Sequence, residues 1–285
     1  MSIGIGLICT DGIVVCADRE FSHPGFSSFS QKIQSICYGR GVVNESFQEV
    51  MTAPLGTFGR YVVLAQAGVD PDMRNVSKDL TDRIKGHDLT NEEVEEEFRE
   101  CVESQVSAEP EGHYQAILPM PNREMSQAQD NRVFHSGNDA VIGCGDHSLA
   151  RYLLEMLLPP VGRLETIDTC QAAIIVSYIV QSIKKYVQGC GGETDIFYLP
   201  ESGAGVHQGN GILEEEFKAL EYRMGMWFRT MANKDTDVVW RDRETEGLIG
   251  YLREMRTKLE TQASTWPPIR FHYGSKPIDS ESDQT

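Results

Sequence analysis

Ser2 carries the hydroxyl whose position most directly suggests chemistry, because it follows the initiator methionine. A hydroxyl is a weak nucleophile until a base takes its proton. Once Met1 is removed, Ser2 supplies that base itself, since a free α-amino group has a reference pKa of about 7.7 to 8.0. No histidine is then required. The alternative interpretation is an ordinary flexible terminus.

Asp18 is the acidic residue expected nearest to Ser2. Two apolar segments flank Thr10-Asp11-Gly12 and form a hairpin pattern. If these three residues are the loop, Gly4 pairs with Asp18. Alternation of strand side chains then puts Ser2 and Asp18 on one side of the hairpin, with room for a cation between them. A two-residue loop would instead put them on opposite faces, and this arrangement would fail.

Cys144 and His147 offer a second kind of nucleophile, because pairing with histidine activates thiols. Both open one expected helix, and no third group is evident, so a packed cysteine and a surface histidine are the preferred interpretation. A metal site is not expected, because the seven histidines are scattered and no Cys-x-x-Cys spacing occurs. We expect no cofactor.

The charge balance limits the partners. The 285 residues include 26 Lys and Arg against 43 Asp and Glu, a formal charge of -17. Nucleic acids and anionic membrane surfaces are therefore improbable partners, whereas proteins, peptides and small molecules fit. Seven cysteines without paired spacing favour reduced thiols and a cytoplasmic location. No apolar run approaches the roughly 20 residues of a membrane helix, and no signal peptide is expected.

The elements that must position these side chains alternate between strands and helices. Strands are expected at 3–8, 13–17, 34–38 and 61–67, and within VFHSGNDAVIGCG and TDIFYL. Helices are expected at 71–84, after a capping residue at Thr90, and at 149–158, 166–187, 213–231 and 245–261. A polar stretch precedes VFHSGNDAVIGCG. This order fits an α+β protein, a four-layer αββα sandwich of two antiparallel sheets flanked by helices.

Four stretches resemble, in the same order, those of proteasome β-type subunits and their bacterial proteasome-like relatives, which are N-terminal nucleophile (Ntn) hydrolases. They are IGIGLICTDGIVVCADRE, QKIQSI, VIGCGDHSLARYLLEML and CGGETDIFYL. Together they span most of the region 2–199. The chain departs from the catalytic subunits in a longer ending after Ile212 and in a longer stretch between Lys32 and Tyr61.

The resemblance also assigns roles to single residues. Lys32 matches the lysine that contacts both the acid and the nucleophile, so Asp18 would orient Lys32 and Lys32 would ease deprotonation of Ser2. Ala65 matches a backbone donor to the oxyanion, where the family usually has glycine. Taken alone, Asp18 and Arg19 are typical of a solvated charge pair, Lys32 of a surface lysine and Ala65 of a packed small residue.

Three positions depart from the active peptidases. Cys144 stands where they carry a serine that hydrogen-bonds the terminal amine, which a thiol does only weakly. Val187 replaces an aspartate that helps to position that amine, and Cys190 replaces a second serine. These changes weaken the enzymatic interpretation.

The predicted domain spans 2–272, with a helical extension from about residue 213 and a disordered tail over 273–285. Apolar residues of the extension are expected to lie mostly in the core: Met224, Met226, Trp227, Phe228, Leu248, Leu252, Met255 and Leu259. The resemblance implies that the protein assembles with copies of itself.

The sequence therefore predicts a proteasome-like N-terminal-serine hydrolase of peptide or amide bonds. Expected partners are peptide or protein substrates and further copies of the chain, with an ATP-dependent unfoldase as a candidate. One alternative is a non-catalytic ring or scaffold subunit, which retained Met1 or acetylated Ser2 would favour. The other alternative is a hydrolase of small amides on the same scaffold.

Overall fold

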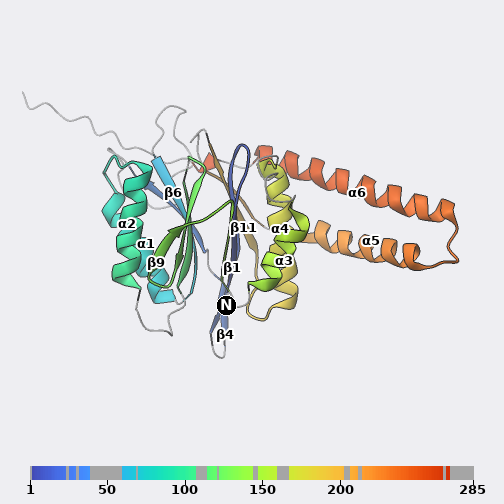
Figure 1. The fold of residues 1–285 in the computed structure, drawn as a ribbon, viewed down its shortest axis with the longest axis horizontal. Helices are drawn as coiled ribbons and strands as arrows, with labels where there is room; N and C mark the ends of the chain where they lie inside the picture. Colours follow the sequence, from blue (N-terminus) through green and yellow to red (C-terminus); the bar gives the residue numbers. More distant parts are fainter. Residues whose placement is uncertain are drawn as a thin grey trace, which may run out of the picture.

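Two antiparallel sheets lie face to face, and helices cover both outer faces (Figure 1). The computed structural model describes residues 2–23, 26–29, 32–38, 60–68, 70–106, 114–120, 122–143, 147–158, 167–201, 206–210, 214–265 and 268–269. The predicted four-layer αββα sandwich is confirmed. A separate hairpin of β3 (Glu20–His23) and β4 (Phe26–Phe29) stands apart from both sheets.

The first sheet has the strand order β10-β1-β2-β11-β12-β13. Its strands are β1 (Ile3–Ile8), β2 (Gly12–Asp18), β10 (Asp139–Gly143), β11 (Thr194–Pro200), β12 (Val206–Asn210) and β13 (Pro268–Ile269). Helices α3 (Ser148–Leu157) and α4 (Thr169–Tyr186) cover its outer face. Asp168 caps α4 with a capping box, which explains why the helix begins after it.

The second sheet has the strand order β5-β6-β7-β8-β9. Its strands are β5 (Ile33–Tyr38), β6 (Arg60–Ala67), β7 (Gln115–Met120), β8 (Glu124–Gln129) and β9 (Arg132–His135). Helices α1 (Asp70–Ile84) and α2 (Asn91–Gln105) cover it. The capping box predicted at Thr90 and Glu93 is present at the start of α2.

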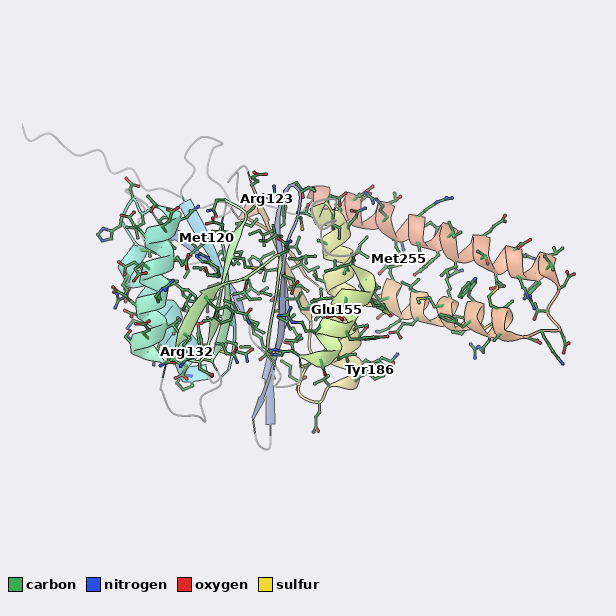
Figure 2. All side chains as sticks on the ribbon, in the orientation of Figure 1. Met120, Arg123, Arg132, Glu155, Tyr186 and Met255 are labelled. Carbon is green, nitrogen blue, oxygen red and sulfur yellow. The ribbon has the colours of Figure 1, made fainter. Side chains whose placement is uncertain are left out.

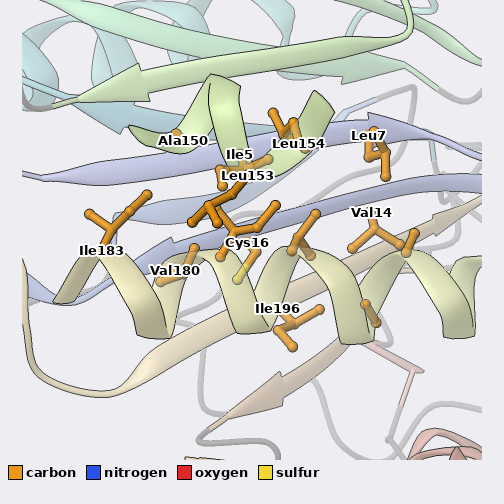
Figure 3. Close-up of a cluster of buried hydrophobic side chains, with 14 of the residues drawn as sticks. Ile5, Leu7, Val14, Cys16, Ala150, Leu153, Leu154, Val180, Ile183 and Ile196 are labelled. Atoms are coloured by element: carbon orange, nitrogen blue, oxygen red, sulfur yellow. The ribbon is translucent and has the colours of Figure 1, made fainter. Parts of the chain in front are cut away.

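Strand β1 shows how the sequence builds two of the layers. Its odd-numbered residues Ile3, Ile5 and Leu7 pack with α3 and α4 (Figure 3). They belong to the cluster of apolar side chains between the first sheet and its helices, which we call the first core. Each such buried aliphatic side chain contributes about 1.5–3 kcal/mol. The even-numbered glycines face the other sheet, where a Cβ added at Gly6 would lie 2.6 Å from the sulfur of Met125. Glycine at this position therefore permits close approach of the two sheets.

Strands β7 and β8 lie within the polar stretch, where the sequence predicts no strand. In β7, Ala116 and Leu118 face the helix-covered core, and Ile117 faces the core between the sheets. A strand buried on both faces shows no polar alternation, so the pattern gave no signal. The turns around these strands also lack glycine, because Arg123 and Asp130 take the left-handed conformation instead.

Helices α5 (Glu214–Ala232) and α6 (Val238–Thr265) form a hairpin that projects from the sandwich (Figure 1). The two arms are joined by a hydrogen bond from the Trp227 indole N–H to the Thr245 hydroxyl, 3.0 Å long. Helix α6 begins earlier than the predicted Thr245, because the Asp237 carboxylate accepts a hydrogen bond from the Val239 N–H at 3.1 Å. Asp237 thus acts as an N-cap that the sequence analysis missed.

The apolar residues of this hairpin divide into two groups. Met255 (Figure 2) is buried, and Met224 and Leu248 pack against the first core. Leu252 and Phe228 are exposed instead, 46% and 59% respectively, so the expectation that they lie in the core is wrong. No helix in the described residues is long and apolar enough to cross a membrane. The domain extent of 2–272 stays a prediction, and the tail over 273–285 lies outside the described residues.

Candidate active site

A buried ion pair joins the two sheets near the start of the chain. The Lys32 Nζ lies 2.6 Å from the Asp18 Oδ1, and both side chains are at most 1% exposed. Asp18 ends β2 of the first sheet, and Lys32 immediately precedes β5 of the second. The interpretation of both as surface residues is therefore wrong.

Two backbone N–H groups also hold the Asp18 carboxylate. Its Oδ1 accepts a hydrogen bond from the N–H of Ile3 at 2.9 Å, and its Oδ2 accepts one from the N–H of Gly191 at 2.9 Å. With Lys32, the carboxylate has three described donors, which fix its orientation. The Ile3 contact brings Asp18 to the peptide bond that follows Ser2.

The hairpin register differs from the predicted one. Ile8 pairs with Ile13 and Gly4 with Ala17, while the Cys9 N–H donates to the Gly12 carbonyl at 2.7 Å. The loop is therefore the two-residue Thr10-Asp11, and simple alternation would put Ser2 and Asp18 on opposite faces. The predicted side-by-side arrangement of these two residues is wrong in its geometry. Asp18 approaches Ser2 along the backbone instead, through its bond to the Ile3 N–H.

Ser2 is buried directly before β1. Its neighbour Ile3 pairs with Gly143, the last residue of β10. A Cβ at Gly143 would collide with the Ser2 carbonyl oxygen. Gly143 also has a φ of 117°, which other residues rarely adopt, so both the contact and the backbone conformation require glycine. The Gly143 N–H donates to the Gln115 Oε1 at 2.7 Å, which ties this end of β10 to the second sheet.

Lys32 is anchored through its own backbone. Its carbonyl accepts a hydrogen bond from the Gln66 N–H at 3.0 Å, so β6 fixes the residue that carries the cation. Ala65 precedes Gln66, pairs with Ile33 and Ile117, and has its side chain buried in the core between the sheets. The oxyanion role of Ala65 stays a prediction.

The loop after α4 carries two of the departures from the peptidases. Val187 follows the last residue of α4, and both Val187 and Cys190 pack against the first core. Cys190 precedes Gly191, so it lies beside the peptide that contacts Asp18. Cys144 lies outside the described residues. The nearby His147 has its Nε2 3.1 Å from the Gly143 carbonyl oxygen.

Three of the described thiols are poor nucleophiles. Burial raises the pKa of Cys9 to about 12 and that of Cys101 to about 12, and it raises the pKa of Cys16 further. Because the thiolate is the reactive species, these groups stay protonated and inert near neutral pH. We expect iodoacetamide at pH 8 to leave all three unmodified in the native protein and to alkylate them in denaturant, as measured by peptide mass mapping. Native alkylation accompanied by loss of hydrolysis would contradict this account.

Several groups at the site were not foreseen from the sequence. The N–H groups of Ile3 and Gly191 contact Asp18, and Gly143 makes room for Ser2. The helix expected at 166–187 indicated where α4 ends, but nothing in the sequence indicated that the following glycine donates to a carboxylate. In the described part of the chain, no group of three His, Cys, Asp or Glu residues is arranged to hold a metal ion.

The sequence matches no protein-family model and no curated protein. Solved structures are similar over most of the chain. Anbu, described as an ancestral β-subunit, from Yersinia bercovieri has a TM-score of 0.62 at 11% identity and covers 83% of this chain and 100% of its own. An Anbu Gly-1 mutant from Hyphomicrobium sp. strain MC1 has a TM-score of 0.61 at 14% identity, covering 84% and 100%.

A third similar structure is a helical assembly of the Anbu complex from Pseudomonas aeruginosa. It has a TM-score of 0.57 at 12% identity and covers 84% of this chain and 99% of its own. The fold is the proteasome-like Ntn hydrolase fold. At such low identity the likeness shows the fold and leaves activity to be argued from the site.

Proposed function

We propose that this protein is a proteasome-like N-terminal-serine hydrolase that cleaves peptide or other amide bonds, with Ser2 as nucleophile after Met1 is removed. One observation carries the proposal. A buried Lys32–Asp18 ion pair lies at the start of β1, and Asp18 is hydrogen-bonded to the peptide N–H that follows Ser2. The Ntn fold supports the same assignment.

The chemistry needs few groups. The α-amine of Ser2 takes the proton of its own hydroxyl while Oγ forms a bond to the substrate carbonyl carbon. The same proton passes to the departing nitrogen as the C–N bond breaks, which leaves an acyl ester on Ser2. The amine then deprotonates a water molecule, whose oxygen adds to the carbonyl carbon of the ester. The bond between Oγ and that carbon breaks, the amine returns the proton to Oγ, and the acid leaves. The positive charge of Lys32 favours the developing negative charge on Oγ throughout.

The energetic cost of the ion pair supports a functional role. Taking two charges out of water costs several kcal/mol per ion, and an apolar pair of similar volume is often as stable. Asp18 and Lys32 are nevertheless both buried, with Asp18 held by three described donors. Charged groups that are buried and oriented in this way are typical of catalytic sites.

A non-catalytic ring or scaffold subunit is the second candidate function. The observation that favours it is that Val187, which stands where the peptidases have an aspartate, is apolar and packs against the first core, so its side chain provides no polar group for the terminal amine. The two candidates are separated by assaying the purified protein against fluorogenic peptides and a panel of small amides. Hydrolysis of either class supports the enzyme and identifies its substrate class, whereas no hydrolysis with a free Ser2 amine supports the scaffold.

We also propose that the protein assembles with copies of itself. Ile249 and Leu252 of α6 are 43% and 46% exposed on the projecting hairpin, and Phe228 of α5 is 59% exposed. Large apolar side chains gathered on a projecting element are typical of protein interfaces. The similar structure described as a helical assembly supports a second copy as the partner. An enclosed assembly would admit only unfolded proteins, which is why we retain an ATP-dependent unfoldase as a proposed partner.

The double variant Ile249→Glu with Leu252→Glu is expected to weaken assembly, because two carboxylates would be desolvated at the interface. Multi-angle light scattering at micromolar concentration should shift from an oligomer toward the 31.9 kDa monomer. Arg253→Ala, an exposed neighbour on α6, serves as the control and should leave the mass unchanged. A native protein that is already monomeric under these conditions would refute assembly.

A further inference from the structure

We propose that Arg19 and Asp195 are a positioning pair, which holds the Gly191 peptide against the Asp18 carboxylate and so fixes the orientation of Asp18 toward Lys32. The inference rests on the proposed function, since that function gives Asp18 its role. The pair acts through Asp18.

Arg19 forms a bidentate ion pair with the buried Asp195 and a single contact with the exposed Glu193. The Arg19 Nε donates to the Asp195 Oδ2 at 2.8 Å, and its Nη2 donates to the Asp195 Oδ1 at 2.6 Å. A third nitrogen, Nη1, donates to the Glu193 Oε2 at 2.9 Å. Asp195 is 1% exposed and Glu193 is 64% exposed, so the contact with Asp195 restrains the Arg19 side chain more strongly than the contact with Glu193. A guanidinium engaged in this way is not arranged to bind a substrate carboxylate.

Residues 18–20 form hydrogen bonds with both the carbonyl and the N–H of Gly191. Its carbonyl accepts hydrogen bonds from the N–H groups of Arg19 at 3.2 Å and Glu20 at 3.1 Å. Its N–H donates to Asp18. Three consecutive residues, 18 to 20, therefore bind one glycine. A Cβ at Gly191 would meet the end of the Glu20 side chain, which would have to move to make room.

The side-chain pair ties the end of β2 to β11, the strand that follows this loop. Asp195 lies in β11 opposite Ala17, and Arg19 directly follows β2, so their ion pair bridges the end of one strand and the start of the next. The Arg19 N–H also donates to the Glu193 carbonyl at 3.1 Å. Without the pair, the loop from Val187 to Glu193 gains freedom and the Gly191 N–H moves away from Asp18. The carboxylate then loses one of its three described donors, and Lys32 loses a fixed partner.

Asp195→Asn and Arg19→Lys test the proposal, because each keeps the approximate volume but removes the bidentate charge pair. Hydrogen exchange at the Gly191 amide, resolved by fragmentation mass spectrometry, should accelerate about tenfold in both variants. The kcat should fall by about 10²-fold with little change in KM, as expected for a misplaced catalytic group. Glu193→Gln removes only the exposed arm and is the matched control, with exchange and kcat near those of the native protein.

Double variants separate positioning from general stability. In an Asp18→Asn background, Asp195→Asn should cause no further loss of kcat, because both changes act through one carboxylate. A further loss in the double variant, or unchanged Gly191 exchange in the single variants, would overturn the proposal. If the native protein hydrolyses no substrate, the proposed function fails, and the exchange at Gly191 alone still decides whether the pair positions Asp18. Arg19→Lys, the milder change, provides this readout if Asp195→Asn does not fold.

Discussion

Replacing Lys32 with methionine is expected to abolish hydrolysis and to lower the free energy of unfolding by about 3 kcal/mol. Methionine fills a similar volume but leaves the buried Asp18 carboxylate with no cation, since the two side chains are at most 1% exposed. The loss should lie near the lower end of the range for a broken buried pair, because the Ile3 and Gly191 N–H groups still bind Asp18. Urea denaturation and peptide hydrolysis measure the two effects.

The matched control is Lys185→Met, a lysine of α4 that pairs with Glu221 on the surface. An exposed pair contributes little, so this variant should retain both stability and hydrolysis. Equal destabilisation by the two substitutions would show that the buried Lys32–Asp18 pair contributes no more to stability than an exposed pair. A Lys32→Met protein that still hydrolyses amides at the native rate would remove Lys32 from the mechanism.

Replacing Ser2 with alanine is expected to reduce hydrolysis by at least about 10³-fold, because the nucleophile itself is removed. Alanine is also small enough to permit removal of Met1, so the free amine is retained. The change deletes one hydroxyl, and the free energy of unfolding should stay within about 1 kcal/mol of the native value. Hydrolysis assays and urea denaturation on the same preparations test both parts.

Ser126→Ala is the control for this substitution, because Ser126 is a fully buried serine of β8 in the core of the second sheet. It should leave hydrolysis unchanged. Residual activity of Ser2→Ala near the native rate would point to another nucleophile. Inactivity of both variants would indicate a general effect of losing a buried hydroxyl.

The layers of the fold could be predicted because periodicity and capping are local signals. The glycines and aliphatic residues of β1 alternate, and Thr90 and Asp168 each begin a helix with a side-chain cap. Strands such as β7 were missed for the opposite reason. Its residues 116–120 are buried on both faces, so no alternation marks them as a strand.

The candidate site was predictable only in part. Asp18 and Lys32 were paired from the resemblance, and the structure places their charged atoms 2.6 Å apart. The hairpin geometry was not predictable, because the choice between a two-residue and a three-residue loop depends on the Cys9–Gly12 pairing. The part played by Gly191 was also missed, since a backbone donor leaves no mark in the side-chain sequence.

The most direct test of the nucleophile is the mass of the protein before and after treatment with a peptide β-lactone, which acylates reactive hydroxyls. We predict that the untreated protein lacks Met1. After treatment, tandem mass spectrometry should find one acyl group on the peptide that begins at Ser2, and none on Ser2→Ala. A protein that keeps Met1 yet hydrolyses amides, or an acyl group on any other residue, would contradict the account.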